Sequence, residues 1–470
     1  MKISSFIVVT IFSLLVSVSA SGVAPKYVFL FIGDGMSVPQ RMTANEFSIK
    51  TGNGPLEMNS LPVSGLARSC SADSLITDSA AAATAIACGK KTNNHFSGVD
   101  PDGNPLESCA VVAQRAGRKI GIMTTVTITH ATPAGFYAHR ESRGDTYGIS
   151  TDLADSGFDF FAGGGLGGSD LPSPTNRYDY AVSKGYTLIT NRADFAALRP
   201  GCGKILTKFT NDSLETAIDW DESLGQPKLD EIVAKAVEVL DNDKGFFIMC
   251  EGGRIDWAGH GNDAATNLRD VIALNDAVRV ALAFQEKHPA ETLVIVTGDH
   301  ETGGMTMGFN NTGYNLYPEN LACQTMSVGR FNNEVKKLFA EKKAMVGFED
   351  VKPLIARAFG FRFEGEKKDM MVLKKDELKA LAKAFDHDVK LLRDGVRETE
   401  DYMAKLRYTL GNECRTILSH KCGLDWTSGS HTAMPVLTTA KGPEAARFSG
   451  FYENTEIGNR IKAMYAAEMK

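Results

Sequence analysis

The stretch KYVFLFI, residues 26–32, is a nearly continuous apolar run, and GDGM follows it at residues 33–36. A strand that is apolar on both faces is typical of a parallel sheet with helices packed against both sides. In such sheets, ligands bind at the carboxyl ends of the strands. The stretch therefore predicts a buried parallel strand with Asp34 at its ligand-binding end.

Three later apolar runs repeat this arrangement and cover Lys119–Val126, Gly245–Cys250 and Thr292–Thr297. Helical segments lie between them, notably Leu229–Leu240 and Asn267–Glu286, and the second has apolar residues near a 3.6-residue period. Buried strands that alternate with helices indicate an α/β fold. We expect a doubly wound, mainly parallel central sheet with helices on both faces.

Each of the four predicted strands leads into a side chain that can bind a metal ion. These side chains are Asp34, Thr132, Glu251 and Asp299. Any one of them alone would be interpreted as a turn residue. Because parallel strands bring their carboxyl ends to one edge of a sheet, four such residues together indicate a common ligand site.

The stretch TDSAAAATA, residues 77–85, places a serine at the start of an alanine-rich run. Alanine has the highest helix propensity, so a helix is expected to begin here. Its free N–H groups and the positive end of its dipole would then point at Ser79 and stabilise an alkoxide or a phosphate. The simpler alternative is that Asp78 or Ser79 is only an N-cap.

Residues 1–20 have the pattern of a secretory signal peptide. A positive Met1-Lys2 start precedes a mostly apolar run at residues 6–18, and small residues follow at Val18-Ser19-Ala20. An uncleaved anchor is the alternative, but the apolar run is short for a membrane span. We therefore expect export to the periplasm or the extracellular space, with no membrane span after cleavage.

The mature chain, residues 21–470, is interpreted as one catalytic domain with an insertion at about residues 310–425. Within the insertion, residues 367–407 are rich in Lys, Glu, Leu and Ala and predict one or two exposed helices. The net charge of −6 argues against nucleic-acid binding. Eight cysteines permit disulfides in an exported protein, and Cys414–Cys422 is the preferred pair.

Three further motifs supply imidazole and carboxylate groups. Asp256 and His260 are four residues apart, so both can face one ion if the segment is helical. The pair Asp299-His300 follows a buried strand, and His431 stands in a small polar turn. Zinc prefers such ligands, whereas magnesium prefers oxygen. Together with the strand-end oxygens, these groups suffice for two Zn²⁺ and one Mg²⁺.

A cluster of this kind suits phosphoryl transfer. Two close metal ions stabilise both the attacking and the leaving oxygen of an in-line displacement. Arg143 would bind two non-bridging oxygens with its guanidinium fork. Ser79, deprotonated beside a bound zinc, would be a nucleophile that needs no histidine base.

The order of these motifs resembles that of the alkaline phosphatase family. Six blocks between about residues 27 and 465 carry the resemblance: Gly33–Met36, Asp78–Ala80, His130–Pro133 with Arg143, Glu251–His260, Thr297–His300 and Gly429–Thr432. The resemblance implies an exported enzyme, commonly a homodimer. Its expected reaction is hydrolysis of small phosphate monoesters to an alcohol and inorganic phosphate through a phosphoserine.

The resemblance also implies a role for each matched position. Ser79 corresponds to the phosphorylated nucleophile and Arg143 to the phosphate-binding arginine. The implied metal ligands are Asp256, His260 and His431 for one zinc, Asp34, Asp299 and His300 for the second zinc, and Asp34, Thr132 and Glu251 for magnesium.

Two positions that vary within the family are expected to contact the substrate. His130 stands where some members have aspartate, which exchanges a negative charge and puts the magnesium affinity in doubt. Trp257 stands where other members have lysine or histidine. If Trp257 lines the cleft, phosphate loses a positive contact and is expected to leave faster.

Other functions remain open at this stage. A phosphodiesterase of the same superfamily would use similar metal ligands, although the expected magnesium set favours monoesters. A sulfatase would need an x-Pro-x-Arg sequence after its nucleophile, whereas four alanines follow Ser79. A non-catalytic exported protein that binds phosphate or metal would keep the ligands but have no use for Ser79.

Overall fold

A ten-stranded sheet forms the centre of the protein. The computed structural model describes residues 24–168, 176–342, 345–366, 368–393 and 410–469, so the expected signal peptide lies outside the described residues. The strand order is β14-β2-β13-β8-β1-β7-β3-β4-β6-β5. The strands are β1 (Tyr27–Gly33), β2 (Val63–Arg68), β3 (Lys119–Thr124), β4 (Phe160–Ala162), β5 (Tyr186–Ile189), β6 (Lys204–Thr207), β7 (Phe246–Gly252), β8 (Thr292–Gly298), β13 (Val436–Lys441) and β14 (Gly450–Glu453).

The four strands predicted from apolar runs, β1, β3, β7 and β8, lie next to one another and are parallel. Strand β13 pairs antiparallel with both β8 and β2. All seven residues of β1 are buried, as are all seven of β7 and of β8. Burial on both faces explains why these strands read as continuous apolar runs rather than alternating ones.

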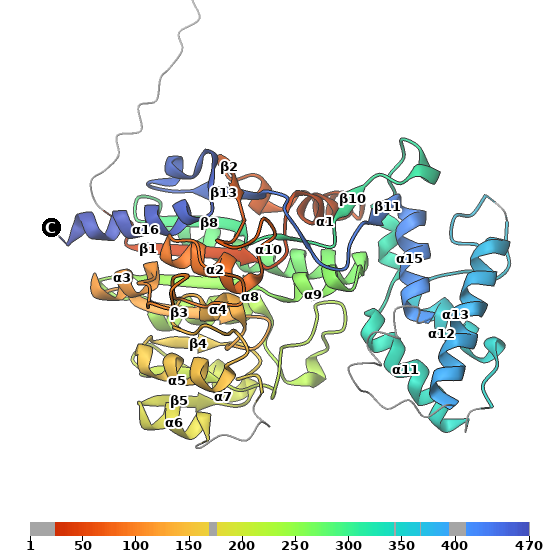
Figure 1. The fold of residues 1–470 in the computed structure, drawn as a ribbon, viewed down its shortest axis with the longest axis horizontal. Helices are drawn as coiled ribbons and strands as arrows, with labels where there is room; N and C mark the ends of the chain where they lie inside the picture. Colours follow the sequence, from red (N-terminus) through yellow and green to blue (C-terminus); the bar gives the residue numbers. More distant parts are fainter. Residues whose placement is uncertain (1–23, 169–175, 343–344, 367, 394–409, 470) are drawn as a thin grey trace, which may run out of the picture.

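Two hydrophobic clusters, one on each face, account for the doubly wound arrangement. Phe29 and Phe31 of β1 belong to a cluster that includes helices α8 (Leu229–Leu240) and α10 (Ala264–Lys287). Val28, Leu30 and Ile32 point the other way, into a cluster that includes α2 (Ser79–Cys88), α3 (Cys109–Arg115) and α16 (Thr455–Glu468). Figure 1 shows the helices on both sides of the sheet. The predicted α/β fold is thereby confirmed.

Further helices pack around the sheet. They are α1 (Val38–Lys50), α2 (Ser79–Cys88), α3 (Cys109–Arg115), α4 (Ala131–Ala134), α5 (Thr146–Ser156), α6 (Arg177–Ser183), α7 (Arg192–Ala197), α9 (Arg254–His260) and α16 (Thr455–Glu468). Two small ribbons accompany them: β9 (Glu301–Thr302) with β12 (His431–Thr432), and β10 (Met305–Met307) with β11 (Leu424–Trp426).

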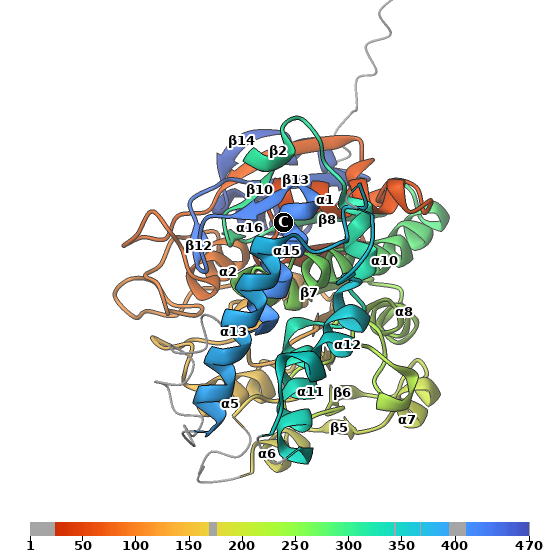
Figure 2. The ribbon, with the colours of Figure 1, turned by 90° about the vertical axis from the view of Figure 1, so that its right-hand side faces the viewer.

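Residues within the range of the expected insertion form a helical lobe on one side of the sheet (Figures 1 and 2). It contains α11 (Val328–Glu341), α12 (Phe348–Phe359), α13 (Lys375–Arg393) and α15 (Leu410–Cys422). The part of the expected charged helices at residues 394–409 lies outside the described residues. At the start of α11, the Ser327 and Val328 amides donate to Asp219 and Asp263 of the main body, at 3.0 Å each.

The disulfide preferred from the sequence is wrong. Cys414 and Cys422 are both buried free thiols on helix α15. Eight residues of helix separate them by about 12 Å along its axis, which is far beyond the reach of a disulfide. The prediction failed because it placed this segment in a loop.

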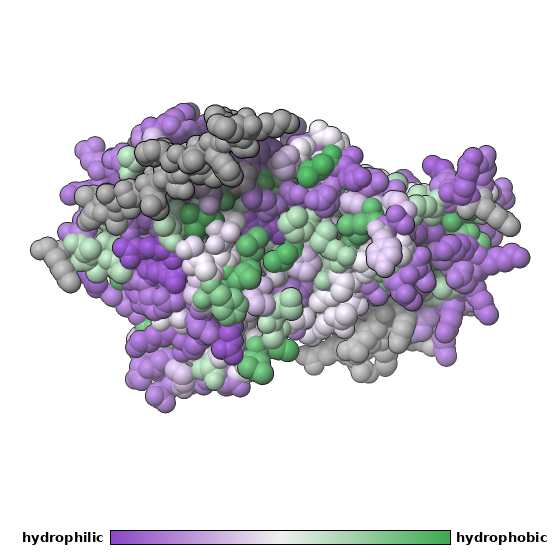
Figure 3. Space-filling view, turned by 90° about the horizontal axis from the view of Figure 1, so that it is seen from above, coloured by the Kyte–Doolittle hydropathy of each residue, from purple (hydrophilic) through white to green (hydrophobic). Residues whose placement is uncertain are grey.

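No helix among the described residues has the length and apolar character that a membrane crossing requires. The face seen in Figure 3 is mainly hydrophilic, with apolar side chains in small groups.

Candidate active site

Three carboxylates meet at the carboxyl edge of the sheet because of the strand register. Ile32 of β1 lies beside Glu251 of β7, and Gly33 lies beside Gly298 of β8. Asp34 and Asp299 directly follow β1 and β8, so both emerge next to Glu251. All three carboxylates are fully buried. Gly35 follows with a φ of +71°, and a Cβ there would lie 2.7 Å from a hydroxyl, so this turn favours glycine.

Thr132 and His130 lie near these carboxylates, in the segment that follows the carboxyl end of β3. Thr132 lies on the short helix α4, eight residues beyond the end of β3, and its hydroxyl donates to Asp34 Oδ2 at 3.4 Å. His130 Nδ1 lies 3.8 Å from Asp34 and 3.7 Å from Glu251. Asp34, His130 and Glu251 therefore form one group able to hold an ion.

Helix α9 brings Asp256 and His260 together, as their spacing predicts for a helix. His260 Nε2 lies 3.3 Å from Asp256 Oδ2. His431 on β12 arrives through the pairing of β12 with β9, and its Nε2 lies 3.5 Å from Asp256 and 3.2 Å from His260 Nε2. Three residues that are up to 175 positions apart in sequence thus face one point.

His300 joins the two halves of the cluster. Its Nε2 lies 3.3 Å from Asp34 and 3.3 Å from Asp299, and these three residues form a second potential ion site. Its ring stacks on that of His431, with centroids 3.6 Å apart, and Asp256, His300 and His431 form a third group. All eight side chains predicted as metal ligands therefore lie in one continuous cluster.

Ser79 lies at the edge of this cluster, at the first residue of α2. Asp78 is the N-cap and accepts a hydrogen bond from the Ala81 amide at 2.9 Å. The Ser79 hydroxyl is 1% exposed, and its Oγ lies 3.2 Å from His300 Nε2. The capping alternative therefore applies to Asp78, and Ser79 is left facing the potential ligands.

Arg143 is held at the mouth of the site. One guanidinium nitrogen donates to Asp78 Oδ2 at 3.1 Å, and the other lies 3.3 Å from His130 Nε2. The sequence predicts no role for Asp78 beyond capping the helix. Its Oδ2, which does not cap the helix, fixes the arginine, so one carboxylate orients both the Ser79 helix and Arg143.

Trp257 is half-buried on α9, next to Asp256. Its ring lies 6.1 Å from that of His130, edge to face, and the Arg254 guanidinium lies 4.8 Å from its centre. It lines a cleft of about 700 Å³ between the main body and the start of α11. Trp257 therefore lies near His130 and also lines this cleft.

The electrostatic setting differs strongly across the cluster. Burial and the charges of Asp299, Asp256 and Glu251 raise the pKa of Asp34 well above its usual value, and burial does the same to the pKa of Asp299. Burial would also raise the pKa of Asp256, but hydrogen bonding to His260 and the neighbouring imidazoles hold it below its usual value. Asp34 and Asp299 are therefore the carboxylates whose negative charge a bound cation would stabilise most.

The donor atoms fit metal ions. Asp34 Oδ1, Glu251 Oε1, Asp299 Oδ2 and His130 Nδ1 are buried, and no described residue forms a hydrogen bond with any of them. Buried polar atoms normally have partners, so such a group of orphaned oxygens on one point indicates ion ligation. Nitrogen-containing sets suit zinc, and the oxygen-rich set around Asp34 and Glu251 suits a harder ion.

Two threonines that sequence reasoning missed support the ligands. The Thr302 hydroxyl donates to Asp256 Oδ1 at 2.5 Å and lies 3.2 Å from His300 Nδ1. The Thr124 hydroxyl donates to Glu251. Thr124 ends β3 and Thr302 ends β9, and no distinctive motif in the sequence marks either of them.

Comparisons with known proteins show what the whole chain is similar to. The sequence model of the alkaline phosphatase family matches residues 25–158 and 166–467. An alkaline phosphatase of Schizosaccharomyces pombe is 31% identical over 461 residues, covering 92% of this chain and 80% of the relative. The crystal structure of a cold-active alkaline phosphatase from a Shewanella species has a TM-score of 0.77 and 26% identity, with 93% and 99% of the two chains covered.

A third similar structure concerns the metal site. It is a variant of the alkaline phosphatase from the Antarctic bacterium TAB5, in which a histidine is replaced by aspartate and magnesium is bound in the M3 site. The two chains are 26% identical, with a TM-score of 0.64 and with 94% of this chain and 98% of that chain covered.

Proposed function

This chain belongs to the alkaline phosphatase family and is a metal-dependent phosphoesterase, and we propose that it hydrolyses phosphate monoesters through a covalent phosphoserine at Ser79. One observation carries the proposal. Ser79 Oγ lies 3.2 Å from His300 Nε2, the same nitrogen that faces Asp34 and Asp299 at 3.3 Å each. The hydroxyl therefore adjoins the potential ion site rather than an isolated histidine base.

The proposed ligand sets are those that the resemblance to the family implies. Asp256, His260 and His431 would hold one zinc, and Asp34, Asp299 and His300 the second, while Asp34, Thr132 and Glu251 would hold magnesium. Bound ions supply a Lewis acid that lowers the pKa of the serine hydroxyl and neutralises charge on phosphoryl oxygens. His130 is a further candidate for the magnesium set, because it faces Asp34 and Glu251.

The protein's own groups then position the phosphoryl group. The free N–H groups at the start of α2 direct positive potential at Ser79 Oγ, which favours its ionised form and a bound phosphate. Arg143, fixed by Asp78, would donate to two non-bridging oxygens. Trp257 would line the side on which the alcohol leaves, toward the cleft beside α11.

The serine is tested by Ser79→Ala in enzyme loaded with zinc and magnesium. Loss of the nucleophile should lower kcat by at least about 10³-fold while metal content and phosphate binding persist. The matched control is Ser60→Ala, an exposed serine beyond α1 that should leave activity unchanged. Full phosphate release by Ser79→Ala would refute the proposal.

The preference for monoesters is tested separately. A monoester and a diester with the same leaving group should differ strongly in kcat/KM in favour of the monoester, because a diester has one fewer oxygen for Arg143 and the ions to bind. Faster turnover of the diester would support the phosphodiesterase alternative instead.

The cellular setting completes the proposal. We infer export to the periplasm or outside the cell after removal of residues 1–20, and assembly as a homodimer. N-terminal sequencing of the secreted protein and light scattering of the purified enzyme test these two inferences.

A further inference from the structure

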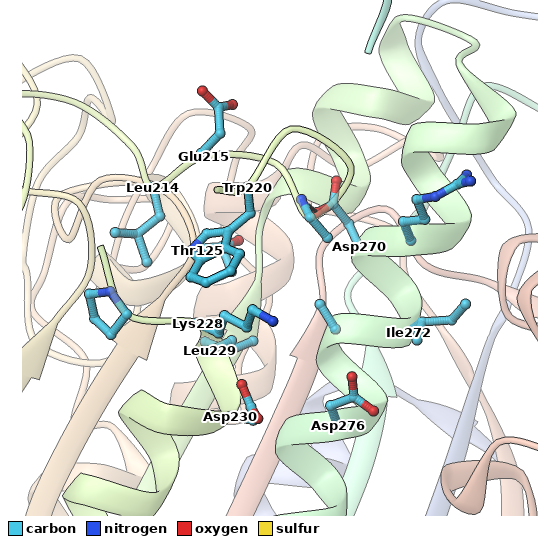
Figure 4. A pocket seen from close by; sticks show the side chains of 14 residues that line it. Thr125, Leu214, Glu215, Trp220, Lys228, Leu229, Asp230, Asp270, Ile272 and Asp276 are labelled. Atoms are coloured by element: carbon cyan, nitrogen blue, oxygen red, sulfur yellow. Dashed lines mark hydrogen bonds between the residues drawn. The ribbon is translucent and has the colours of Figure 1, made fainter. Parts of the chain in front are cut away.

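A second cavity lies apart from the catalytic cluster. It is enclosed by the start of α8, helix α10 and the segment 214–228, and its volume is about 240 Å³ (Figure 4). None of the eight residues proposed as metal ligands lines it. Thr125, just beyond the end of β3, forms part of its wall, with its amide bonded to the Glu251 carbonyl at 3.2 Å. The cavity therefore lies behind the catalytic edge of the sheet.

Carboxylates dominate the polar lining of this cavity. They are Glu215, Asp230, Asp270 and Asp276. Of the two basic lining residues, Arg269 directs its guanidinium to the carbonyls of Leu321 and Gln324, at 3.4 and 3.2 Å. The other is Lys228, whose Nζ lies 4.2 Å from the centre of the Trp220 ring. The cavity is thus acidic, and its aromatic wall already contacts an ammonium group.

Asp270 carries a polar atom without a partner. The residue is 5% exposed, and its Oδ1 accepts a hydrogen bond from the Ala217 amide at 2.9 Å. Its Oδ2 is buried, and no described residue donates to it. Leaving a buried carboxylate oxygen without a donor is costly. Figure 4 shows this carboxyl group across the cavity from Trp220.

We propose that this cavity binds a small organic ammonium ion. The ammonium group donates to Asp270 Oδ2, and the aliphatic part lies against Trp220 and Leu229. The carboxylate recognises the ammonium group through a charge-assisted hydrogen bond, and the aromatic ring and the leucine side chain offer apolar contact to the aliphatic part. The four lining carboxylates disfavour anions. A bare metal ion would make no use of the apolar wall. At about 30 Å³ for each water-sized group, the volume limits the ligand to about eight non-hydrogen atoms.

The test is calorimetric titration of the metal-loaded enzyme with n-butylammonium, with 1-butanol as the uncharged control. At pH 8 the amine is protonated and cannot ligate zinc, and Asp270, whose pKa burial raises to about 7, is ionised. We expect a Kd of about 1 mM for the ammonium and no measurable binding of the alcohol. Saturating inorganic phosphate should not compete, because the cavity is separate from the catalytic site.

Three variants sharpen the test. Asp270→Asn should weaken binding at least tenfold, whereas Asp179→Asn, an exposed residue of α6, should not change it. Lys228→Met should strengthen binding several-fold, because it removes the cation that competes for the cavity. A gain of affinity cannot arise from misfolding, and melting curves check Asp270→Asn. Equal binding of butanol, competition by phosphate, or unchanged binding in both Asp270→Asn and Lys228→Met would overturn the proposal.

Discussion

Two sides of the catalytic cluster differ in chemistry although they share one edge of the sheet. The imidazole side consists of Asp256, His260 and His431, and the His260 side chain is 40% exposed. The carboxylate side, Asp34, Glu251 and Asp299 with Thr132, is fully buried. On the imidazole side the neighbouring rings lower the pKa of Asp256, whereas on the carboxylate side burial and like charges raise the pKa of Asp34 and Asp299.

This difference shows that strand ends alone do not set the character of a metal site. The imidazole side comes from helix α9 and the late strand β12, which supply two imidazoles beside one carboxylate. The carboxylate side comes directly from β1, β7 and β8, which deliver negative groups into the interior. The imidazole side is stable without a bound ion. The carboxylate side is electrostatically unfavourable until a cation neutralises its charges.

Removal of the metal ions should have the largest effect. Chelation is expected to lower activity by at least about 10³-fold and to lower the melting temperature, because the carboxylate side is left with unpaired buried groups. Activity before and after chelation, together with metal analysis, measures this. Return of activity on adding zinc and magnesium is the control, and a chelated enzyme that keeps its activity would contradict the comparison.

The supporting threonines separate the two sides. Thr302→Val removes a hydrogen bond to Asp256, so it should weaken zinc binding about 10- to 100-fold with little effect on magnesium. Thr124→Val removes the hydrogen bond to Glu251, so it should weaken magnesium binding with little effect on zinc. Competitive metal titrations measure both, and Thr→Ser at each position should restore affinity. Identical metal profiles of the two valine variants would mean that the sides are not separate.

His130→Asp should move the carboxylate side further toward magnesium. The substitution adds an oxygen ligand and a negative charge beside Asp34 and Glu251, so magnesium affinity is expected to rise about tenfold. Isothermal titration with magnesium checks it, and weaker binding would show that His130 itself is the better ligand.

Trp257→Lys should change phosphate release by a smaller factor. A lysine there would add a positive charge near the cleft, so inorganic phosphate should inhibit roughly three- to tenfold more strongly. Trp257→Phe keeps an aromatic ring and serves as the control. The inhibition constant for phosphate measures the effect, and an unchanged constant would sink the idea that this position controls phosphate release.

The pH dependence of the metal-free protein should show the smallest effect, a few degrees in melting temperature. The pKa values of Asp34, Asp299 and His260 are raised in the folded state, so their stabilising contributions are lost as pH rises through those values. Burial lowers the pKa of His300 and His431, and their contributions are already complete above about pH 6.5. From pH 7 to 9 the metal-free protein should therefore become less stable, and added zinc should remove the trend.

The inner strands were predictable because burial on both faces leaves a continuous apolar signal. Helix α8 was predicted with its observed bounds, Leu229–Leu240, and α10 within three residues at its start. Strand β2 was missed because only two of its six residues are buried, so no apolar run marks it. Chain connectivity alone does not reveal that β13 inserts antiparallel between β2 and β8.

The candidate site was predictable to the extent that its side chains are chemically distinctive. The aspartates, the glutamate and the histidines that were predicted as metal ligands stand out in the sequence, and they lie together in the structure. Asp78, Thr124 and Thr302 are ordinary residue types in ordinary settings, and only three-dimensional proximity reveals their contacts. The Cys414–Cys422 error has the same origin, because sequence closeness was taken for spatial closeness on a helix that separates the two thiols.

Anomalous scattering at the zinc absorption edge tests the central claim most directly. In crystals of the enzyme loaded with zinc and magnesium, two zinc peaks are expected, one among Asp256, His260 and His431 and one among Asp34, Asp299 and His300. Density without an anomalous signal is expected beside Thr132 and Glu251. A zinc peak beside Thr132 and Glu251 with none beside His260, or no peak within ligand distance of His300, would contradict the two-sided account.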